Sequence, residues 1–128
     1  MSYHFSRQLK LSMADAEKRV VARLAEEGFG VLTEIDVQAT LKKKLGVEFT
    51  PYKILGACNP HFAYQALQVE PHIGTMLPCN VILRGTTEGS IEVSAVDPLA
   101  SMQAIDNPEL GAVATQVRDK LKRVIESL

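Results

Sequence analysis

The sequence contains no tryptophan, and aromatic residues make up only 5% of its 128 residues. A platform for single-stranded nucleic acid needs several aromatic rings on which bases stack, so the composition disfavours that class of protein. An excess of basic charge is also missing, because the formal net charge is -1. Proteins that bind nucleic acid through its phosphates carry clustered lysine and arginine. We therefore expect no nucleic-acid partner.

Long apolar runs are missing too, since none approaches the roughly 20 residues that a membrane-spanning helix needs. The first residues, Met1-Ser-Tyr-His-Phe5, lack the apolar core of a signal peptide. We therefore expect a cytoplasmic location and no membrane partner. The two cysteines, Cys58 and Cys79, are expected to be free thiols in that reducing compartment.

Recognisable metal and cofactor motifs are absent. Two cysteines with one histidine fall short of a four-ligand zinc set, and there is no C-x-x-C pair, so we expect no metal site. The patterns G-x-G-x-x-G, G-x-x-x-x-G-K-[ST], H-E-x-x-H and G-x-S-x-G are missing as well. The cofactor is therefore unknown from the sequence, and no reaction is assigned.

The residues that are present indicate one globular domain spanning 1–128. Apolar residues make up 46% and charged residues 23% of the chain, as in ordinary soluble proteins, and this length suffices for a single core. Alternating and short apolar runs predict strands, and apolar residues at helical spacing predict helices. The expected strands are 3–11, 29–35, 52–58, 77–83 and 90–96, and the expected helices are 13–27, 37–45, 60–69 and 108–128.

The order of these elements is β-α-β-α-β-α-β-β-α. The last two strands are joined by a turn of a few residues, which permits only antiparallel pairing. Strands with one polar face, accompanied by amphipathic helices, indicate an α+β two-layer sandwich with a mainly antiparallel sheet of about five strands and helices on one face. Arg7 interrupts the apolar row of the first strand, so we expect that strand at an edge of the sheet.

Two Cys-Asn pairs stand at strand ends. Cys58-Asn59 closes the strand 52–58, and Cys79-Asn80 opens the strand that follows. If those strands are antiparallel neighbours, both pairs meet at one end of the sheet, and Asp97 arrives there from the next strand. Pro60 begins a helix at the same place, and helix N-termini attract anions and lower thiol pKa values. The sequence therefore predicts a site of two thiols, two carboxamides and a carboxylate.

Each of these residues also has a structural explanation. Cysteine is commonly a small buried apolar residue, Asn59 before Pro60 is explained by helix capping, and Asp97 before a proline is typical of a turn. Asn80 is the less ordinary case, because asparagine is disfavoured within strands. His61 is placed to activate Cys58 if the two lie close, although an exposed histidine is the commoner outcome.

A family resemblance follows from four segments of the sequence. Gly28-Phe-Gly-Val-Leu-Thr-Glu-Ile-Asp36, Tyr52-Lys-Ile-Leu-Gly-Ala-Cys-Asn-Pro60, Leu77-Pro-Cys-Asn-Val81 and the Asp97-Pro98 turn resemble, in order, the DUF302 family of unknown function. The resemblance covers the chain from about residue 5 to its end. It implies a small α+β domain with an antiparallel sheet and a homodimer, and it implies no settled activity, cofactor or substrate.

Three functions remain open. The first is a binding domain that holds a small polar or anionic ligand through Asn59, His61, Asn80 and Asp97. The second is a thiol enzyme or redox sensor with Cys58 and Cys79 as attacking and resolving groups. The third is a structural or dimerisation module. The sequence favours ligand binding, and it does not decide whether the protein is an enzyme.

Overall fold

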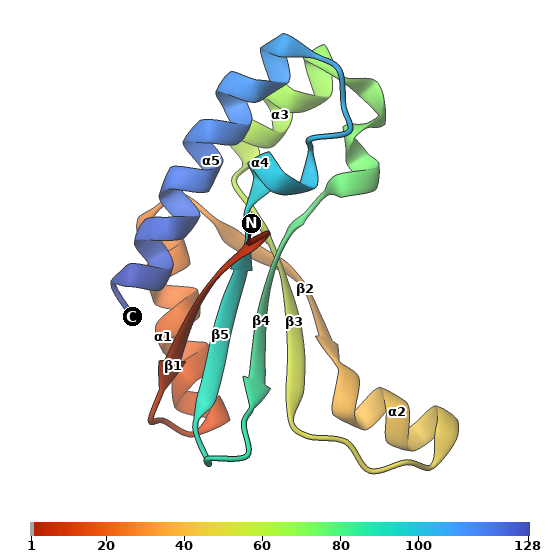
Figure 1. Cartoon of the computed structure of the whole chain (residues 1–128), viewed down its shortest axis with the longest axis vertical. Coiled ribbons are helices and arrows are strands. Elements are labelled where there is room, and N and C mark those ends of the chain that lie inside the picture. The colour runs from red at the N-terminus through yellow and green to blue at the C-terminus, as the bar shows by residue number, and fades with distance from the viewer. Residues whose placement is uncertain (1) are drawn as a thin grey trace.

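A computed structural model describes residues 2–128 as a five-stranded sheet with helices. The strands lie in the order β1-β5-β4-β3-β2, and every neighbouring pair is antiparallel. Figure 1 shows the sheet in the lower half of the molecule. The α+β sandwich and the edge position of the first strand are confirmed. The strands are β1 His4–Leu9, β2 Gly30–Asp36, β3 Tyr52–Cys58, β4 Cys79–Gly85 and β5 Ile91–Val96.

The helices fall into three groups. The long helices α1 (Met13–Glu26) and α5 (Pro108–Glu126) pack on one face of the sheet. The short helices α3 (Pro60–Val69), η1 (Pro71–Met76) and α4 (Pro98–Ser101) gather beyond one end of the sheet, together with the start of α5. We call residues 59–77 and 97–112 the helical lobe. Helix α2 (Val37–Leu45) projects near the opposite end, as Figure 1 shows.

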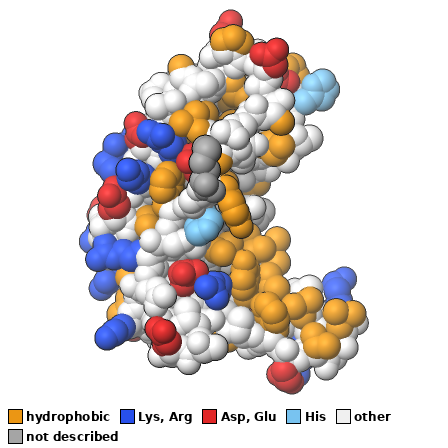
Figure 2. All heavy atoms as spheres, in the orientation of Figure 1, with side chains coloured by type: hydrophobic (Ala, Val, Ile, Leu, Met, Phe, Trp, Pro, Cys, Tyr) orange, Lys and Arg blue, Asp and Glu red, His pale blue; other side chains and the backbone are white. Residues whose placement is uncertain are grey.

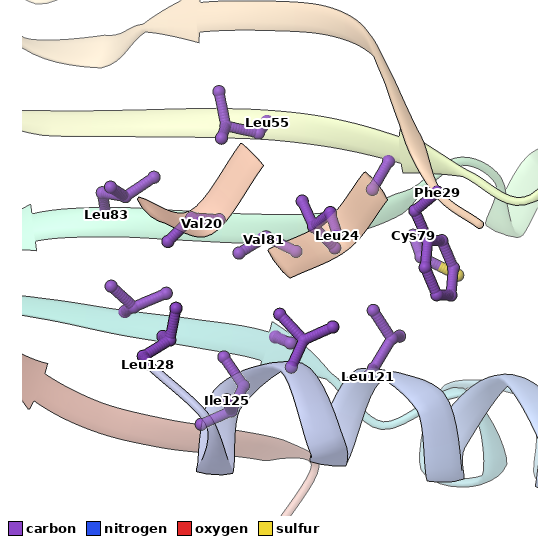
Figure 3. Packing of buried hydrophobic residues seen from close by; sticks show 14 of the residues in the cluster. Val20, Leu24, Phe29, Leu55, Cys79, Val81, Leu83, Leu121, Ile125 and Leu128 are labelled. Carbon is purple, nitrogen blue, oxygen red and sulfur yellow. The ribbon is translucent and has the colours of Figure 1, made fainter. Parts of the chain in front are cut away.

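The core lies between the sheet and the two long helices. Ala16, Val20 and Leu24 follow one another at four-residue intervals on α1, so they form one buried stripe. Figure 3 shows Val20 and Leu24 of this stripe among labelled side chains of β3, β4 and α5. The central members are buried almost completely, including Leu24, Leu55, Val81, Leu83 and Leu121. No helix of residues 2–128 is long and apolar enough to cross a membrane.

The predicted ends of the elements are mostly right where a cap defines them. Ser12 accepts a hydrogen bond from the Asp15 N–H (3.1 Å), and Asp36 accepts one from the Ala39 N–H (2.9 Å). Gly46 ends α2 with φ of 69°, a left-handed conformation that glycine adopts freely. These three residues begin or end their helices as the sequence predicts.

Several short elements differ from the prediction. The strand expected at 77–83 begins at Cys79, because Pro78 has no N–H to contribute to the ladder. The residues after the helix expected at 60–69 form the 3-10 helix η1, and the Asp97-Pro98 turn opens the short helix α4. The strand expected at 3–11 is confined to His4–Leu9. In each of these short segments the sequence pattern is too brief to fix the boundary.

The face of the sheet opposite α1 and α5 is here called the open face. Residues directly opposite one another on antiparallel strands point to the same side of a sheet. One such row crosses the whole open face and places isoleucines beside serines. Its members are Ile35, Ile54, Ile82, Ser94 and Ser6. The neighbouring row contains Leu83 and Val93, which point into the core.

Gly56 is a point of close contact on this face. A Cβ atom at this position would overlap Thr33 Oγ1 and lie 2.7 Å from Pro78 Cγ. We expect Gly56→Ala to lower the free energy of unfolding by about 1–3 kcal/mol, as overpacking does elsewhere. Urea denaturation measures the loss. Gly30→Ala is the control, since no atom lies within 4 Å of its added methyl group, and equal losses in the two variants would contradict this account.

Candidate functional site

The antiparallel pairing of β3 and β4 brings the two cysteines to one end of the sheet. Ala57 lies opposite Cys79, and Gly56 lies opposite Asn80. Cys58 is the last residue of β3, and Cys79 is the first residue of β4. Cys58 and Cys79 therefore lie at one end of the sheet, as the sequence predicts, and both residues line a single cavity.

Asn80 does not join the thiols. Side chains alternate across a strand, so Cys79 points to the core side with Val81, whereas Asn80 is exposed and lines a hollow on the open face beside Ile82 and Arg84. The prediction of two carboxamides on one rim is wrong for this reason. The pleat of the sheet separates the two members of the second Cys-Asn pair.

Asn59 lies at the cavity, but its role differs from the predicted cap. Its side chain makes no capping hydrogen bond to α3. Instead Asn59 Nδ2 donates to the backbone oxygen of Glu27 at 3.2 Å, and the residue is buried. This bond joins the end of α1 to the start of α3. The similar Asn107 does cap its helix, because its Oδ1 accepts from the Glu109 N–H at 3.1 Å.

Asp97 and His61 lie outside the cavity wall. Asp97 Oδ1 accepts a hydrogen bond from the Leu99 N–H (3.0 Å) and so caps α4, while the next residue, Pro98, lines the cavity. The His61 side chain is exposed, and its ring centroid lies 5.9 Å from that of Phe62. The structure therefore brings neither the carboxylate nor the imidazole to the thiols.

The cavity has a volume of about 360 Å³ and an apolar wall. It lies where the ends of β3 and β4 meet the helical lobe, and Figure 3 shows Cys79 beside Phe29 at that end of the core. The polar side chains in the wall are Cys58, Cys79 and Asn59. The apolar wall includes Phe29, Leu32, Phe62, Ala63, Ala66, Leu67, Leu77, Met102, Leu110, Val113, Ala114 and Val117.

The sequence predicts a site at this end of the sheet, but it does not predict the apolar wall of the cavity. Leu110, Val113 and Val117 have the spacing of a buried stripe on the last helix. That spacing gives no sign that this part of the stripe faces a cavity. One usable signal exists. The segments that build the lobe, 59–77 and 97–112, contain no lysine or arginine, which is unusual for helices that form a solvated surface.

The two thiols differ in their surroundings. Cys79 is buried and Cys58 is half-buried. Burial, with a smaller contribution from the charge of Cys58, raises the pKa of the Cys79 thiol to about 11. This direction is opposite to the lowering expected from a helix N-terminus. Cys79 is therefore a protonated thiol at neutral pH, and Cys58 is the more accessible sulfur.

The part of the chain that the structure describes holds no group of three histidine, cysteine or acidic side chains placed to bind a metal ion. The cavity can accept an apolar molecule by contact, and it offers one half-buried thiol and the Asn59 amide as polar groups.

Comparison with known proteins gives a family and a fold. The sequence profile of the family described as "Domain of unknown function DUF302" matches residues 5–128. A solved structure described as an uncharacterized conserved DUF302 protein from Bacillus stearothermophilus is 27% identical, with a TM-score of 0.91, and the match covers 98% of each chain. No curated protein matches the chain.

The raised pKa of Cys79 predicts a pH dependence of stability. A thiol whose pKa is higher in the folded state stabilises that state below its ordinary pKa of 9.0, and this contribution is lost as the pH rises to about 11. The free energy of unfolding should fall by about 1.4 kcal/mol per pH unit in this interval. Urea denaturation of the native protein and of Cys79→Ala measures it, because the variant lacks this component. Parallel pH profiles for the two proteins would contradict the assignment.

Proposed function

The chain belongs to the DUF302 family, whose description assigns no activity, and we propose that its cavity binds a small, mainly apolar molecule. The observation that carries this proposal is a cavity of about 360 Å³ with an almost wholly apolar wall at the predicted end of the sheet. Ligand pockets commonly have volumes of about 300–1,000 Å³, apolar walls and few polar groups.

The wall changes the expected chemistry of the ligand. The sequence favours a polar or anionic molecule, held by the four side chains Asn59, His61, Asn80 and Asp97. Of these residues only Asn59 lines the cavity, and no lysine, arginine or histidine does so. An anion would lose its hydration without gaining a partner charge, which is costly. A neutral molecule with one polar end, directed at Cys58 or Asn59, fits the wall better.

Gly74 offers a way to obstruct the mouth of the cavity. It belongs to η1, is exposed and lines the cavity, and no atom lies within 4 Å of a Cβ added there. We expect Gly74→Leu to fold normally and to lose binding of the neutral dye 6-propionyl-2-(dimethylamino)naphthalene, measured by fluorescence, about tenfold or more. Decanol should displace the dye from the native protein more strongly than decanoate.

The matched control is Gly111→Leu, which lies outside this cavity and also has no atom within 4 Å of an added Cβ. It should bind the dye as the native protein does. Equal binding by Gly74→Leu and the native protein, or no saturable binding by either, would overturn the proposal. Stronger displacement by decanoate would restore the anionic alternative.

The two thiols support a second candidate, a redox pair. Both residues line one cavity, and the charge of Cys58 contributes, after burial, to the raised pKa of the Cys79 thiol. With glutathione disulfide as oxidant, the Cys58 thiolate attacks one sulfur and releases a glutathione thiolate. The Cys79 thiol then loses its proton, attacks the mixed disulfide and releases the second glutathione. Two electrons pass from the protein to the oxidant.

Intact-mass measurement after incubation with glutathione disulfide tests this candidate. The native protein should lose two hydrogens, Cys79→Ser should stop at the mixed disulfide, and Cys58→Ser should not react. Reaction of either thiol only after unfolding in urea would exclude the redox pair. Dye binding by the Cys58→Ser, Cys79→Ser double variant separates the candidates, since apolar binding should survive the loss of both thiols.

A further inference from the structure

A second, smaller hollow lies beside the cavity at the thiol end of the sheet. It has a volume of about 220 Å³ and lies between α4, the link 102–107 and the first turns of α5. Three residues, Met102, Leu110 and Ala114, line both the cavity and this second hollow. Their side chains therefore form the partition between the two spaces.

Met102 is the part of this partition that lies outside the helix packing. Leu110 and Ala114 belong to the buried stripe of α5, and they are 2% and 3% exposed. Met102 is half-buried and follows α4, a helix of only four residues. The flexible thioether chain of methionine commonly fills a gap of irregular shape between packed elements. Truncation of Met102 should therefore join the two spaces while α5 keeps its place.

The helices around the cavity are tied together by two side-chain amides. Asn107 Nδ2 donates to the backbone oxygen of Val69 at 2.7 Å, which joins the start of α5 to the end of α3. Asn59 Nδ2 donates to the backbone oxygen of Glu27 at 3.2 Å and holds the start of α3. Because α3 is anchored at both ends, a molecule longer than the cavity gains room by passing Met102 more readily than by displacing α3.

The polar groups of the cavity wall lie together on one side. Cys58, Asn59 and Cys79 stand at the ends of β3 and β4, whereas the wall residues from α3, α4 and α5 are apolar. A molecule with one polar end and one apolar chain matches this division. With its Nδ2 bonded to Glu27, Asn59 offers Oδ1, an atom that accepts hydrogen bonds and has no proton to donate. It suits a hydroxyl or an amide N–H and not a carboxylate.

The charge of the helical lobe also favours an uncharged molecule. Residues 59–77 and 97–112 contain no lysine or arginine. Figure 2 shows acidic but no basic side chains at the uppermost part of the molecule, which is the helical lobe in Figure 1. An anionic head group would lose its hydration there without gaining a positive partner.

We propose, as an extension that rests on the proposed function, that the cavity binds a single-chain, uncharged amphiphile with its hydroxyl or amide head at Asn59, and that Met102 limits the length of the chain. The share of one water molecule in the liquid, roughly 30 Å³, serves as the volume of one heavy atom. The cavity of about 360 Å³ then holds about twelve heavy atoms, which is the size of decanol. The second hollow has room for about seven more.

Displacement of the neutral dye from the full chain by decanol and by tetradecanol tests the proposal. In the native protein the additional methylene groups of tetradecanol find no room, so the two alcohols should differ in affinity by no more than about fourfold, the effect of one buried methylene. Met102→Ala should bind tetradecanol on the order of fiftyfold more tightly than decanol, because its chain then enters the second hollow. The affinity for decanol itself should stay close to the native value.

Gly111→Leu supplies a block in the second hollow. Gly111 lines that hollow and not the cavity, and no atom lies within 4 Å of a Cβ added there. The double variant Met102→Ala, Gly111→Leu should therefore return to the native preference. The matched control is Met76→Ala, which truncates an exposed methionine of η1 that lines neither space and should leave the preference unchanged. Circular dichroism checks that each variant is folded.

The possible outcomes separate this proposal from the one on which it rests. An unchanged preference in Met102→Ala, with the dye and decanol still bound, would overturn the role of Met102 and leave apolar binding by the cavity intact. A gain for tetradecanol that survives Gly111→Leu would also overturn it, since the chain would then extend elsewhere. Absence of saturable dye and decanol binding by the native protein would overturn both.

Discussion

The antiparallel register of β3 and β4 is the constraint on which the rest of the site depends. It sets Ala57 opposite Cys79 and thereby brings two cysteines, 21 positions apart in the sequence, to one end of the sheet. The same register, combined with the alternation of side chains along a strand, sends Asn80 to the other face. The register of β3 and β4 therefore brings the two cysteine residues to one end of the sheet, and strand alternation separates the Asn80 side chain from that of Cys79.

The helical lobe closes the end of the sheet that this register defines. Its helices bury little within themselves, and they share Ala66, Ile73 and Leu110 in a small cluster of their own. The cavity lies between that cluster and the main core, and its wall is mainly apolar. The hydrogen bond from the Asn59 side chain to the backbone oxygen of Glu27 joins the lobe to the end of α1. The buried Asn59 amide therefore fixes the start of α3, although it makes no capping hydrogen bond to that helix.

The sequence predicts most of the fold because long elements repeat their pattern several times. The stripe Ala16, Val20 and Leu24 and the Ser12 cap define α1 without ambiguity. The site was less predictable. Asn59 precedes Pro60, which is typical of a helix cap. Only the structure shows that its side chain donates to the backbone oxygen of Glu27 instead, 32 positions earlier in the chain. The cavity is a gap between elements from five parts of the chain, and the local periodicity of one element does not indicate such a gap.

The most direct test of the account is an NMR titration of the 15N-labelled chain with decanol. The account predicts saturable shifts at the amides of Ala57, Cys58, Ala63 and Cys79, which surround the cavity, and small shifts at the open-face residue Arg84. The largest shifts on the open face, or shifts that never saturate, would contradict the claim that the thiol end of the sheet is the binding site.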